Sequence, residues 1–241
     1  MRSSRSAPDL RAADPLAPGP AGYAHRGLHD GATFIENSLL AFAAALEDGA
    51  GIECDLRLTA DNQVIVFHDA DALRLCGSPA QIAHSTLADL ARFTVGNHPI
   101  PTLAQLLAIA DGRVPLLLEA KVENDVWRFG PALLAALEPY RGRYGVMSFD
   151  PRLPRWLNSN APDIRRGLVV ADRLSRFRRW IAMTLADAQF LSVDLAAIDQ
   201  PWVARARRRL PVYCWTVRTA ADRALAATHA DALIWEADGR P

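Results

Sequence analysis

Charged side chains stand two residues apart in two short apolar runs of this sequence. Glu53 and Asp55 share one run, and Glu119 and Lys121 share another. In a strand, residues i and i+2 point to the same face, so each pair projects together. Buried strands of this kind are normally apolar, and the charged pairs therefore need a chemical explanation.

Three carboxylates in these runs point to a metal ion. Brought within a few ångströms, Glu53, Asp55 and Glu119 would repel one another and raise one another's pKa. A divalent cation would remove this repulsion. Ligation by oxygen alone suits a hard ion, Mg²⁺ or Ca²⁺, better than zinc.

Basic side chains and histidines accompany the carboxylates. Arg26 and Lys121 would add positive charge beside a metal, which is reasonable only if an anion such as phosphate lies among them. His25 and His68, at the ends of two further apolar runs, can exchange protons near neutral pH. Together these groups indicate metal-assisted cleavage of a phosphate ester.

Each group also has a purely structural interpretation. A single histidine at a strand end is more often hydrogen-bonded there than catalytic. Glu53 and Asp55 alone fit a solvent-facing hairpin edge, and Glu119 with Lys121 alone fits an internal salt bridge. The functional interpretation is favoured because all of these residues fall near the carboxyl ends of predicted strands.

Short runs rich in Val, Ile and Leu predict nine strands, and their weak alternation suits strands buried on both faces. The strands are expected at Gly22–His25, Gly51–Leu58, Gln63–His68, Pro115–Lys121, Gly145–Phe149, Gly167–Ala171, Phe190–Leu195, Pro211–Val217 and Asp231–Trp235. Alanine- and leucine-rich helices are expected at Ser38–Leu46, Thr102–Ala110, Asp125–Leu137, Pro151–Asn158, Arg173–Ala188, Pro201–Arg209 and Ala220–Thr228. Such alternation predicts parallel pairing with right-handed crossovers.

One pair of strands has no helix between its members. Gly51–Leu58 and Gln63–His68 are joined by a turn at Asp61 and Asn62, which predicts an antiparallel hairpin with Asp55 opposite His68. The other eight strands predict a (β/α)₈ barrel of the α/β class, whose active face lies at the carboxyl ends of its strands. An open doubly wound sheet is the alternative, and the absence of a GxGxxG turn weakens it.

Composition narrows the class of protein. The formal net charge is zero, which argues against a nucleic-acid-binding protein. No apolar run reaches the length of a membrane-spanning helix, and three widely spaced cysteines suggest a reduced, cytoplasmic protein. Residues 1–20 contain four prolines and interrupting charges, so we expect an extended or disordered arm there rather than a secretory signal, followed by one domain over 21–241.

Other polar clusters receive a structural interpretation. His29, His84, His98 and His229 are assigned no role. The arginine-rich stretch 173–179 is expected to be a solvated helix face with Leu174, Phe177 and Ile181 facing the core, and a membrane-surface patch is the less favoured alternative. Arginines in 205–209 suit the carboxyl end of a helix.

These motifs, taken in order, resemble the glycerophosphodiester phosphodiesterase family over nearly the whole chain from residue 21. The matching segments are His25-Arg26-Gly27, Glu36-Asn37-Ser38 with Ala41-Phe42, Glu53-Cys54-Asp55-Leu56 with Thr59 and Asp61, Val64–Val66, His68-Asp69, Pro101-Thr102-Leu103, Leu118-Glu119-Ala120-Lys121, Ser148-Phe149 and Trp215-Thr216-Val217. The ordered series is far more specific than any one segment.

The resemblance implies a (β/α)₈ barrel that hydrolyses glycerophosphodiesters to an alcohol and glycerol 3-phosphate. It implies roles for ten residues: His25 and His68 as general acid and base, Glu53, Asp55 and Glu119 as metal ligands, Arg26 and Lys121 as phosphate contacts, Trp215 as a pocket wall, and Glu36 and Asn37 as supporting residues or possible ligands. It does not show which histidine is the acid.

The sequence departs from the family pattern at several positions. Ser38 replaces a threonine, Arg218 an asparagine, and Ile234-Trp235-Glu236 a threonine–aspartate ending. The last two changes are expected at the pocket rim, where they would affect substrate choice. The stretch from His68 to Pro101 is short for this family, so a more open site could admit a lipid-bearing substrate such as a lysophospholipid.

Other functions compete with this interpretation. A related phospholipase would act on lipid phosphodiesters and need only peripheral contact with a membrane. A lyase or aldolase would use Lys121 as a Schiff-base amine, which Glu119 disfavours by keeping that amine protonated. A barrel that only binds phosphorylated ligands is disfavoured because every expected proton-transfer and metal position is occupied.

Overall fold

The computed structural model describes residues 14–123 and 125–241, and its strands close into a barrel. Within these residues, eight parallel strands form a ring that closes where β1 pairs with both β2 and β11. The ring consists of β1 (Tyr23–His25), β2 (Gly51–Leu58), β6 (Leu116–Ala120), β7 (Tyr144–Ser148), β8 (Arg165–Val170), β9 (Phe190–Asp194), β10 (Val212–Val217) and β11 (Ala232–Trp235). The predicted (β/α)₈ barrel is confirmed, and the doubly wound sheet is wrong.

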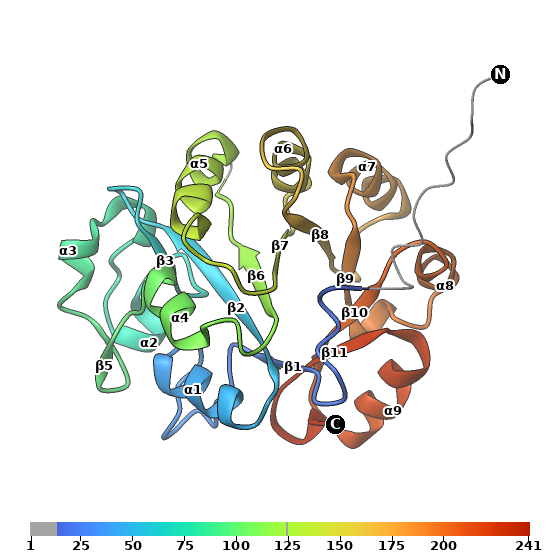
Figure 1. Ribbon diagram of the computed structural model, residues 1–241, viewed down its shortest axis with the longest axis horizontal. Coiled ribbons are helices and arrows are strands. Elements are labelled where there is room, and N and C mark those ends of the chain that lie inside the picture. The colour runs from blue at the N-terminus through green and yellow to red at the C-terminus, as the bar shows by residue number, and fades with distance from the viewer. Residues whose placement is uncertain (1–13, 124) are drawn as a thin grey trace.

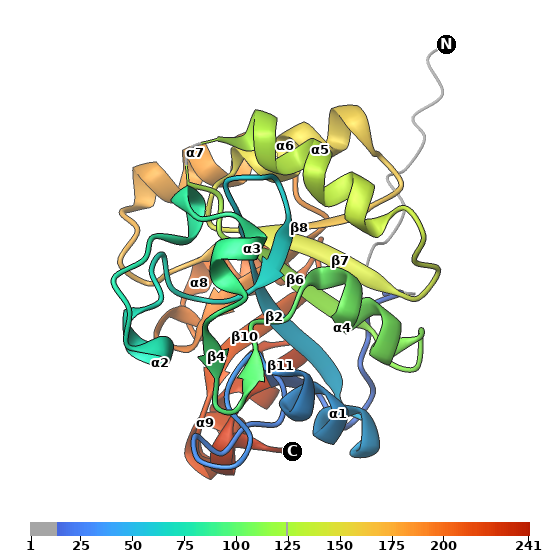
Figure 2. The same cartoon turned by 90° about the vertical axis from the view of Figure 1, so that its left-hand side faces the viewer.

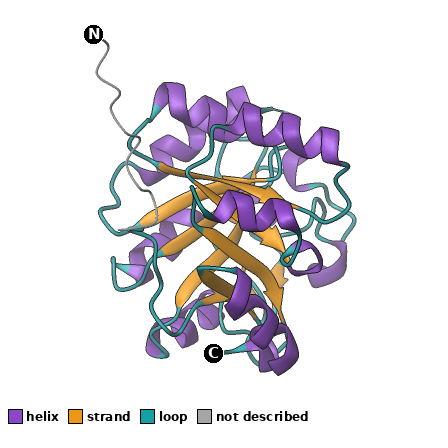
Figure 3. Ribbon diagram, turned by 90° about the vertical axis from the view of Figure 1, so that its right-hand side faces the viewer, coloured by secondary structure: helices purple, strands orange, loops and turns teal. Residues whose placement is uncertain are grey.

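Helices cover the outside of the ring (Figures 1 and 3). They are α1 (Leu39–Glu47), α4 (Leu103–Ala110), α5 (Val126–Leu137), α6 (Arg152–Asn160), α7 (Arg176–Ala186), α8 (Pro201–Arg207) and α9 (Ala220–His229). Side-chain caps set several starts: Ser38, Thr102 and Thr219 each accept a backbone N–H of the first turn. Ser175 does the same for α7, which therefore begins three residues after the predicted Arg173.

The hairpin forms, but its predicted register is wrong by one residue. Strand β3 (Val64–Val66) pairs antiparallel with β2, with Leu56 opposite Val66. The turn is centred on residue 61, because the Thr59 N–H donates to the Gln63 carbonyl at 3.0 Å. Asp55 therefore pairs with Phe67: the Phe67 N–H donates a hydrogen bond to the Asp55 carbonyl at 2.9 Å. His68 lies beyond the end of β3 and not opposite Asp55 as predicted.

The segment between β3 and α4 contains short elements that the sequence did not predict. They are α2 (Leu73–Cys76), a 3₁₀ turn (Ile82–His84), α3 (Leu87–Leu90), β4 (Thr94–Val95) and β5 (His98–Pro99). Ile82, Leu90 and Val95 pack with Ile65 and Phe67 in a small separate apolar cluster. This cluster fixes the segment beside β3 (Figure 1), so that the residues of the segment can reach the carboxyl end of β2.

Side chains fill the inside of the ring at its amino end. Tyr23, Leu117, Met147 and Phe190 pack there around Leu16, which is fully buried. The extended arm was predicted over residues 1–20, of which 1–13 lie outside the described residues. Within the described part, Leu16 lies in the barrel core. Because this end is packed with apolar groups, the polar side chains of the strands gather at the opposite, carboxyl end.

Helix α7 contradicts part of its prediction. Leu174 packs against the core, but Phe177 and Ile181 are exposed, because the inner face is formed by Ala182 and Ala186 instead. The three cysteines are unpaired. No helix in the described part of the chain is long and apolar enough to cross a membrane.

Candidate active site

Three buried carboxylates meet at the carboxyl end of β2 and β6. Glu53 and Asp55 lie two apart on β2, and Asp55 is paired with Glu119 of β6 in the parallel register. One oxygen atom from each lies within 4.8 Å of those from the other two. The predicted meeting of these side chains is confirmed, and the hairpin-edge alternative for Glu53 and Asp55 is wrong because both are buried.

The charges of these carboxylates are only partly balanced. Burial raises the pKa of Glu53, and the charges of Asp55 and Glu119 raise it further. Burial also raises the pKa of Glu119. For Asp55 burial acts in the same direction, but Lys121 and Arg26 outweigh it and hold its pKa well below the usual range. A buried, oxygen-only donor set that resists full ionisation fits a hard divalent cation.

Lys121 and Arg26 are paired with these carboxylates. The Lys121 Nζ lies 2.9 Å from Asp55 Oδ1 and also contacts Glu119 Oε1. The Arg26 Nε lies 3.1 Å from Asp55 Oδ2, and its backbone N–H donates to Glu53 Oε2 at 3.1 Å. The internal salt bridge considered for Glu119 and Lys121 is therefore present, and it places a cation directly beside the carboxylate cluster.

His25 is held by a carboxylate from the far end of the sequence. Its Nδ1 lies 2.8 Å from Glu236 Oε2, and its Nε2 lies 3.9 Å from Glu53 Oε2. Burial lowers the pKa of His25, although the hydrogen bond to Glu236 opposes this shift. A neutral His25 therefore donates from Nδ1 to Glu236 and leaves the Nε2 lone pair beside the carboxylate cluster.

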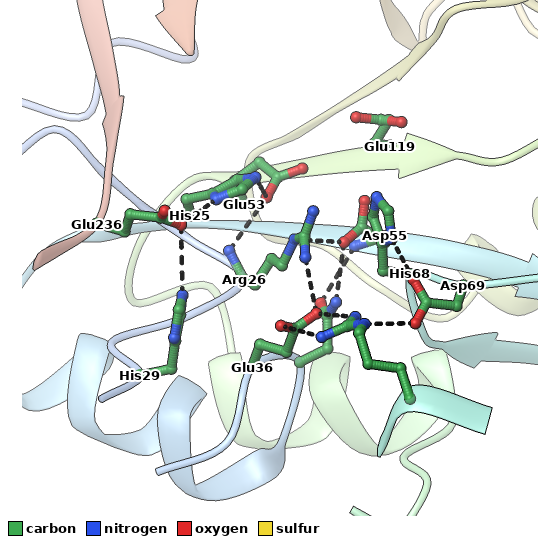
Figure 4. A network of polar contacts seen from close by, with 12 residues as sticks. His25, Arg26, His29, Glu36, Glu53, Asp55, His68, Asp69, Glu119 and Glu236 are labelled. Atoms are coloured by element: carbon green, nitrogen blue, oxygen red, sulfur yellow. Dashed lines mark hydrogen bonds and ion pairs between the residues drawn. The ribbon is translucent and has the colours of Figure 1, made fainter. Parts of the chain in front are cut away.

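His68 has the same arrangement on the other side of Arg26 (Figure 4). Its Nδ1 lies 2.7 Å from Asp69 Oδ1, and burial lowers its pKa. Asp69 in turn accepts a 2.7 Å hydrogen bond from Nε of Arg74, in the segment that follows β3. Each histidine thus has its own orienting carboxylate, as in sites where histidine exchanges protons.

Glu36 and Asn37 support this arrangement from the loop before α1. Glu36 accepts hydrogen bonds from Arg26 at 2.7 Å and from Arg74 at 2.8 Å, so it joins the two arginines. The Asn37 Nδ2 donates to Asp55 Oδ2 at 2.9 Å, and its Oδ1 accepts the Asp55 N–H at 3.3 Å. The geometry favours the supporting role over metal ligation for both residues.

Aromatic side chains stand beside Lys121. Trp215 of β10 donates from Nε1 to the Ser192 carbonyl at 3.1 Å and meets Phe149 edge to face, with ring centroids 5.6 Å apart. The Lys121 Nζ lies 5.5 Å from the centroid of Phe149. Phe149 thus links Trp215 to Lys121, and the role of Trp215 as a pocket wall stays a prediction.

The chain matches the glycerophosphoryl diester phosphodiesterase family over residues 25–239. It belongs to this family. A relative from Mycobacterium tuberculosis, named as a glycerophosphodiester phosphodiesterase, is 29% identical over 234 residues, which cover 84% of this chain and 83% of the relative. The glycerophosphodiester phosphodiesterase of Bacillus altitudinis is 29% identical over 116 residues, which cover 44% of this chain and only 46% of that protein.

Solved structures share the fold. A glycerophosphoryl diester phosphodiesterase structure from Silicibacter pomeroyi superposes with a TM-score of 0.80 at 25% identity and covers 95% of this chain and 94% of its own. An Oleispira antarctica phosphodiesterase, solved with its product sn-glycerol-3-phosphate, has a TM-score of 0.78 at 22% identity and covers 90% of this chain and 92% of its own.

In this phosphodiesterase family member, the prediction that Ile234, Trp235 and Glu236 lie at the pocket rim is wrong. Ile234 and Trp235 are buried in the barrel and do not line a rim. Glu236 contacts His25 and accepts a 2.5 Å hydrogen bond from Arg218. The residue after β11 therefore belongs to the candidate active site and not to its rim. The sequence indicates no role for His29, but its Nε2 lies 3.6 Å from Oε2 of Glu236.

Sequence reasoning missed Glu236 and Arg74 as site residues. A signal for Glu236 was available, since it directly follows the carboxyl end of β11, where the other polar groups also lie. Arg74 had no such signal, because it lies on a short helix that no pattern predicted.

Proposed function

We propose that this chain hydrolyses glycerophosphodiesters to an alcohol and glycerol 3-phosphate. The observation that carries the proposal is the buried cluster of Glu53, Asp55 and Glu119 flanked by two histidines, each oriented by its own carboxylate. Family membership supports the reaction class, and the glycerol 3-phosphate bound to the Oleispira antarctica phosphodiesterase supports the product.

Glu53, Asp55 and Glu119 would hold a divalent ion, Mg²⁺ or Ca²⁺. A bound ion would offset their charge and polarise a phosphoryl oxygen. Burial lowers the pKa of Lys121, but Asp55 and Glu119 outweigh this effect and raise it, so the amine stays protonated. Lys121 and Arg26 can therefore supply positive charge to the oxygens of a phosphodiester, and most where charge develops in the transition state.

His25 and His68 would move the protons. The Nε2 of one would accept a proton from the attacking water as its oxygen bonds to phosphorus. The other histidine, protonated, would donate a proton to the departing alkoxide as the P–O bond to the alcohol breaks. Glu236 and Asp69 hold the two rings by Nδ1 and would stabilise the imidazolium that forms.

A Schiff-base reaction at Lys121 has little support. That reaction needs a neutral amine, whereas Asp55 and Glu119 favour the protonated form. A barrel that only binds phosphorylated ligands would have no use for two histidines oriented through Nδ1. The predicted cytoplasmic location stays a prediction.

The test is the release of glycerol 3-phosphate from a panel of glycerophosphodiesters. We expect turnover that a chelator abolishes and that Mg²⁺ or Ca²⁺ restores. His25→Ala and His68→Ala should each lose most of the turnover while their Tm stays close to that of the parent. Retained activity in both variants would contradict the proposal, and a strong preference for lysophosphatidylcholine over glycerophosphocholine would favour the lipid-directed alternative.

A further inference from the structure

Helix α7 presents an apolar stripe to solvent. Phe177 is 68% exposed and Trp180 is 62% exposed, and Ile181 and Leu185 are exposed as well. Residues three, four and eight apart lie on one face of a helix, so these four side chains form a single stripe. The stripe points away from the barrel, which is the reverse of the usual pattern for a surface helix.

The stripe has no apolar cover in the described part of the chain. The Phe177 and Trp180 rings stack on each other, with centroids 6.3 Å apart and an angle of 26° between planes. Large aromatic side chains exposed side by side are uncommon on a solvated surface and mark an interaction site.

Arginines surround this stripe. Arg173, Arg176 and Arg178 are exposed, and no carboxylate among residues 14–123 and 125–241 forms an ion pair with them. Arg179 lies on the Trp202 ring, 4.4 Å from its centroid. Residues 172–186 contain four arginines and one carboxylate, Asp172, which acts on Arg179. The charge around the stripe is therefore positive on balance, which favours an anionic partner.

The surface continues across the neighbouring helices. Helices α5, α6 and α7 lie side by side (Figures 1 and 2), and α6 packs against both of the others. Trp127, at the start of α5, is 78% exposed. A cleft of about 350 Å³ between these helices is lined by residues that include Trp127, Trp156, Arg155 and Leu185. Five residues separate the end of β8 from the start of α7, so the surface extends to the end of the barrel where the active site lies.

We propose that the α7 face, defined as Arg173, Arg176, Phe177, Arg178, Trp180 and Ile181, docks this protein on a bilayer surface that contains anionic phospholipid. Aromatic side chains insert at the headgroup level, and arginines beside them are attracted by the negative surface potential. A second copy of the chain fits less well, because a two-fold contact would set the same arginines against one another. The docking does not depend on the reaction proposed above.

The experiment is co-sedimentation of the full chain with phosphatidylcholine vesicles, with and without phosphatidylglycerol. We expect binding only to the anionic vesicles, weakened by added salt. The variant Phe177→Ser/Trp180→Ser should lower the partition coefficient about tenfold or more. Replacing any one of Arg173, Arg176 and Arg178 by Ser should lower the partition coefficient about fivefold.

Matched controls lie on other helices. Leu225→Ser on α9 removes an exposed apolar side chain, and Arg205→Ser with Arg208→Ser removes exposed charge from the region of α8. These controls should bind anionic vesicles like the parent. All α7 variants should keep the parent's Tm, because the replaced side chains are exposed.

Three results would overturn the proposal. They are absence of binding to anionic vesicles, equal loss of binding in the control variants, and a concentration-dependent dimer in light scattering that Phe177→Ser/Trp180→Ser abolishes. The last result would assign the α7 face to a second copy of the chain.

Discussion

Glu236 lies 2.8 Å from the Nδ1 of His25, although 211 positions separate the two residues in the chain. The hydrogen bond fixes which nitrogen of His25 carries the proton and leaves Nε2 available beside Glu53. Burial raises the pKa of Glu236, but the hydrogen bond to His25 and the nearby charges outweigh it and keep the carboxylate ionised. The residue that directly follows the last strand of the barrel is therefore part of the proton-transfer apparatus that we propose.

Glu236→Gln should lower kcat about 10- to 100-fold with little change in KM, because Glu236 positions His25. The steady-state rate of glycerol 3-phosphate release measures this, and Tm checks the fold. Glu47→Gln, on the exposed end of α1, is the matched control and should behave like the parent. An unchanged kcat in Glu236→Gln would show that His25 needs no orienting carboxylate.

Asp69→Asn should have a comparable effect on kcat through His68. Arg74→Ala should have a smaller effect, because its partly exposed side chain only steadies Asp69 and Glu36. Asp69 and Arg74 act in one chain of contacts, so the double variant should lose less than the two single losses combined. Fully additive losses would contradict this connection.

Metal binding should raise the free energy of unfolding by about 2.7 kcal/mol at a metal concentration of 100 times Kd. Thermal unfolding with added Mg²⁺ or Ca²⁺ measures this gain. Glu119→Gln should raise the metal concentration needed for half of the gain, and Glu53→Gln should nearly abolish the gain. An equal gain in all three proteins would place the metal elsewhere.

Without metal, Glu53→Gln should raise Tm at neutral pH. Burial and the neighbouring carboxylates raise the pKa of Glu53 in the folded state. The folded state then binds more protons than the unfolded state above the ordinary glutamate pKa, so this group lowers stability as pH rises. Glu53→Gln removes that contribution, and its Tm should fall less than the parent's between acidic and neutral pH. Tm measured across this range in chelator checks the sign.

Asn37 has both a hydrogen-bonding role and an unusual backbone conformation. Its φ of 57° lies in the left-handed region, where asparagine and glycine are favoured. Asn37→Gly should lose only the hydrogen bonds to Asp55, at about 1–3 kcal/mol. Asn37→Ala should lose about 1 kcal/mol more, because alanine adopts this conformation at a cost. Urea unfolding compares the two, and a more stable alanine variant would contradict the argument.

The sequence by itself determined the alternation of strands and helices, and with it the barrel. It also determined that Glu53 and Asp55 point the same way, because the i, i+2 relation is a local property of any strand. Parallel strands end at the same edge, so the meeting of these residues with Glu119 followed from the barrel alone.

Only the tertiary structure decided the contacts between distant segments. Glu236 reaches His25 because β11 closes the ring against β1, and Arg74 reaches Asp69 because a separate apolar cluster fixes the segment after β3. The hairpin register depended on hydrogen bonds within the turn, which shifted it by one residue. The orientation of α7 was decided in the same way: periodicity shows that a helix has two faces, but packing of Ala182 and Ala186 against the barrel leaves Phe177 and Trp180 outside.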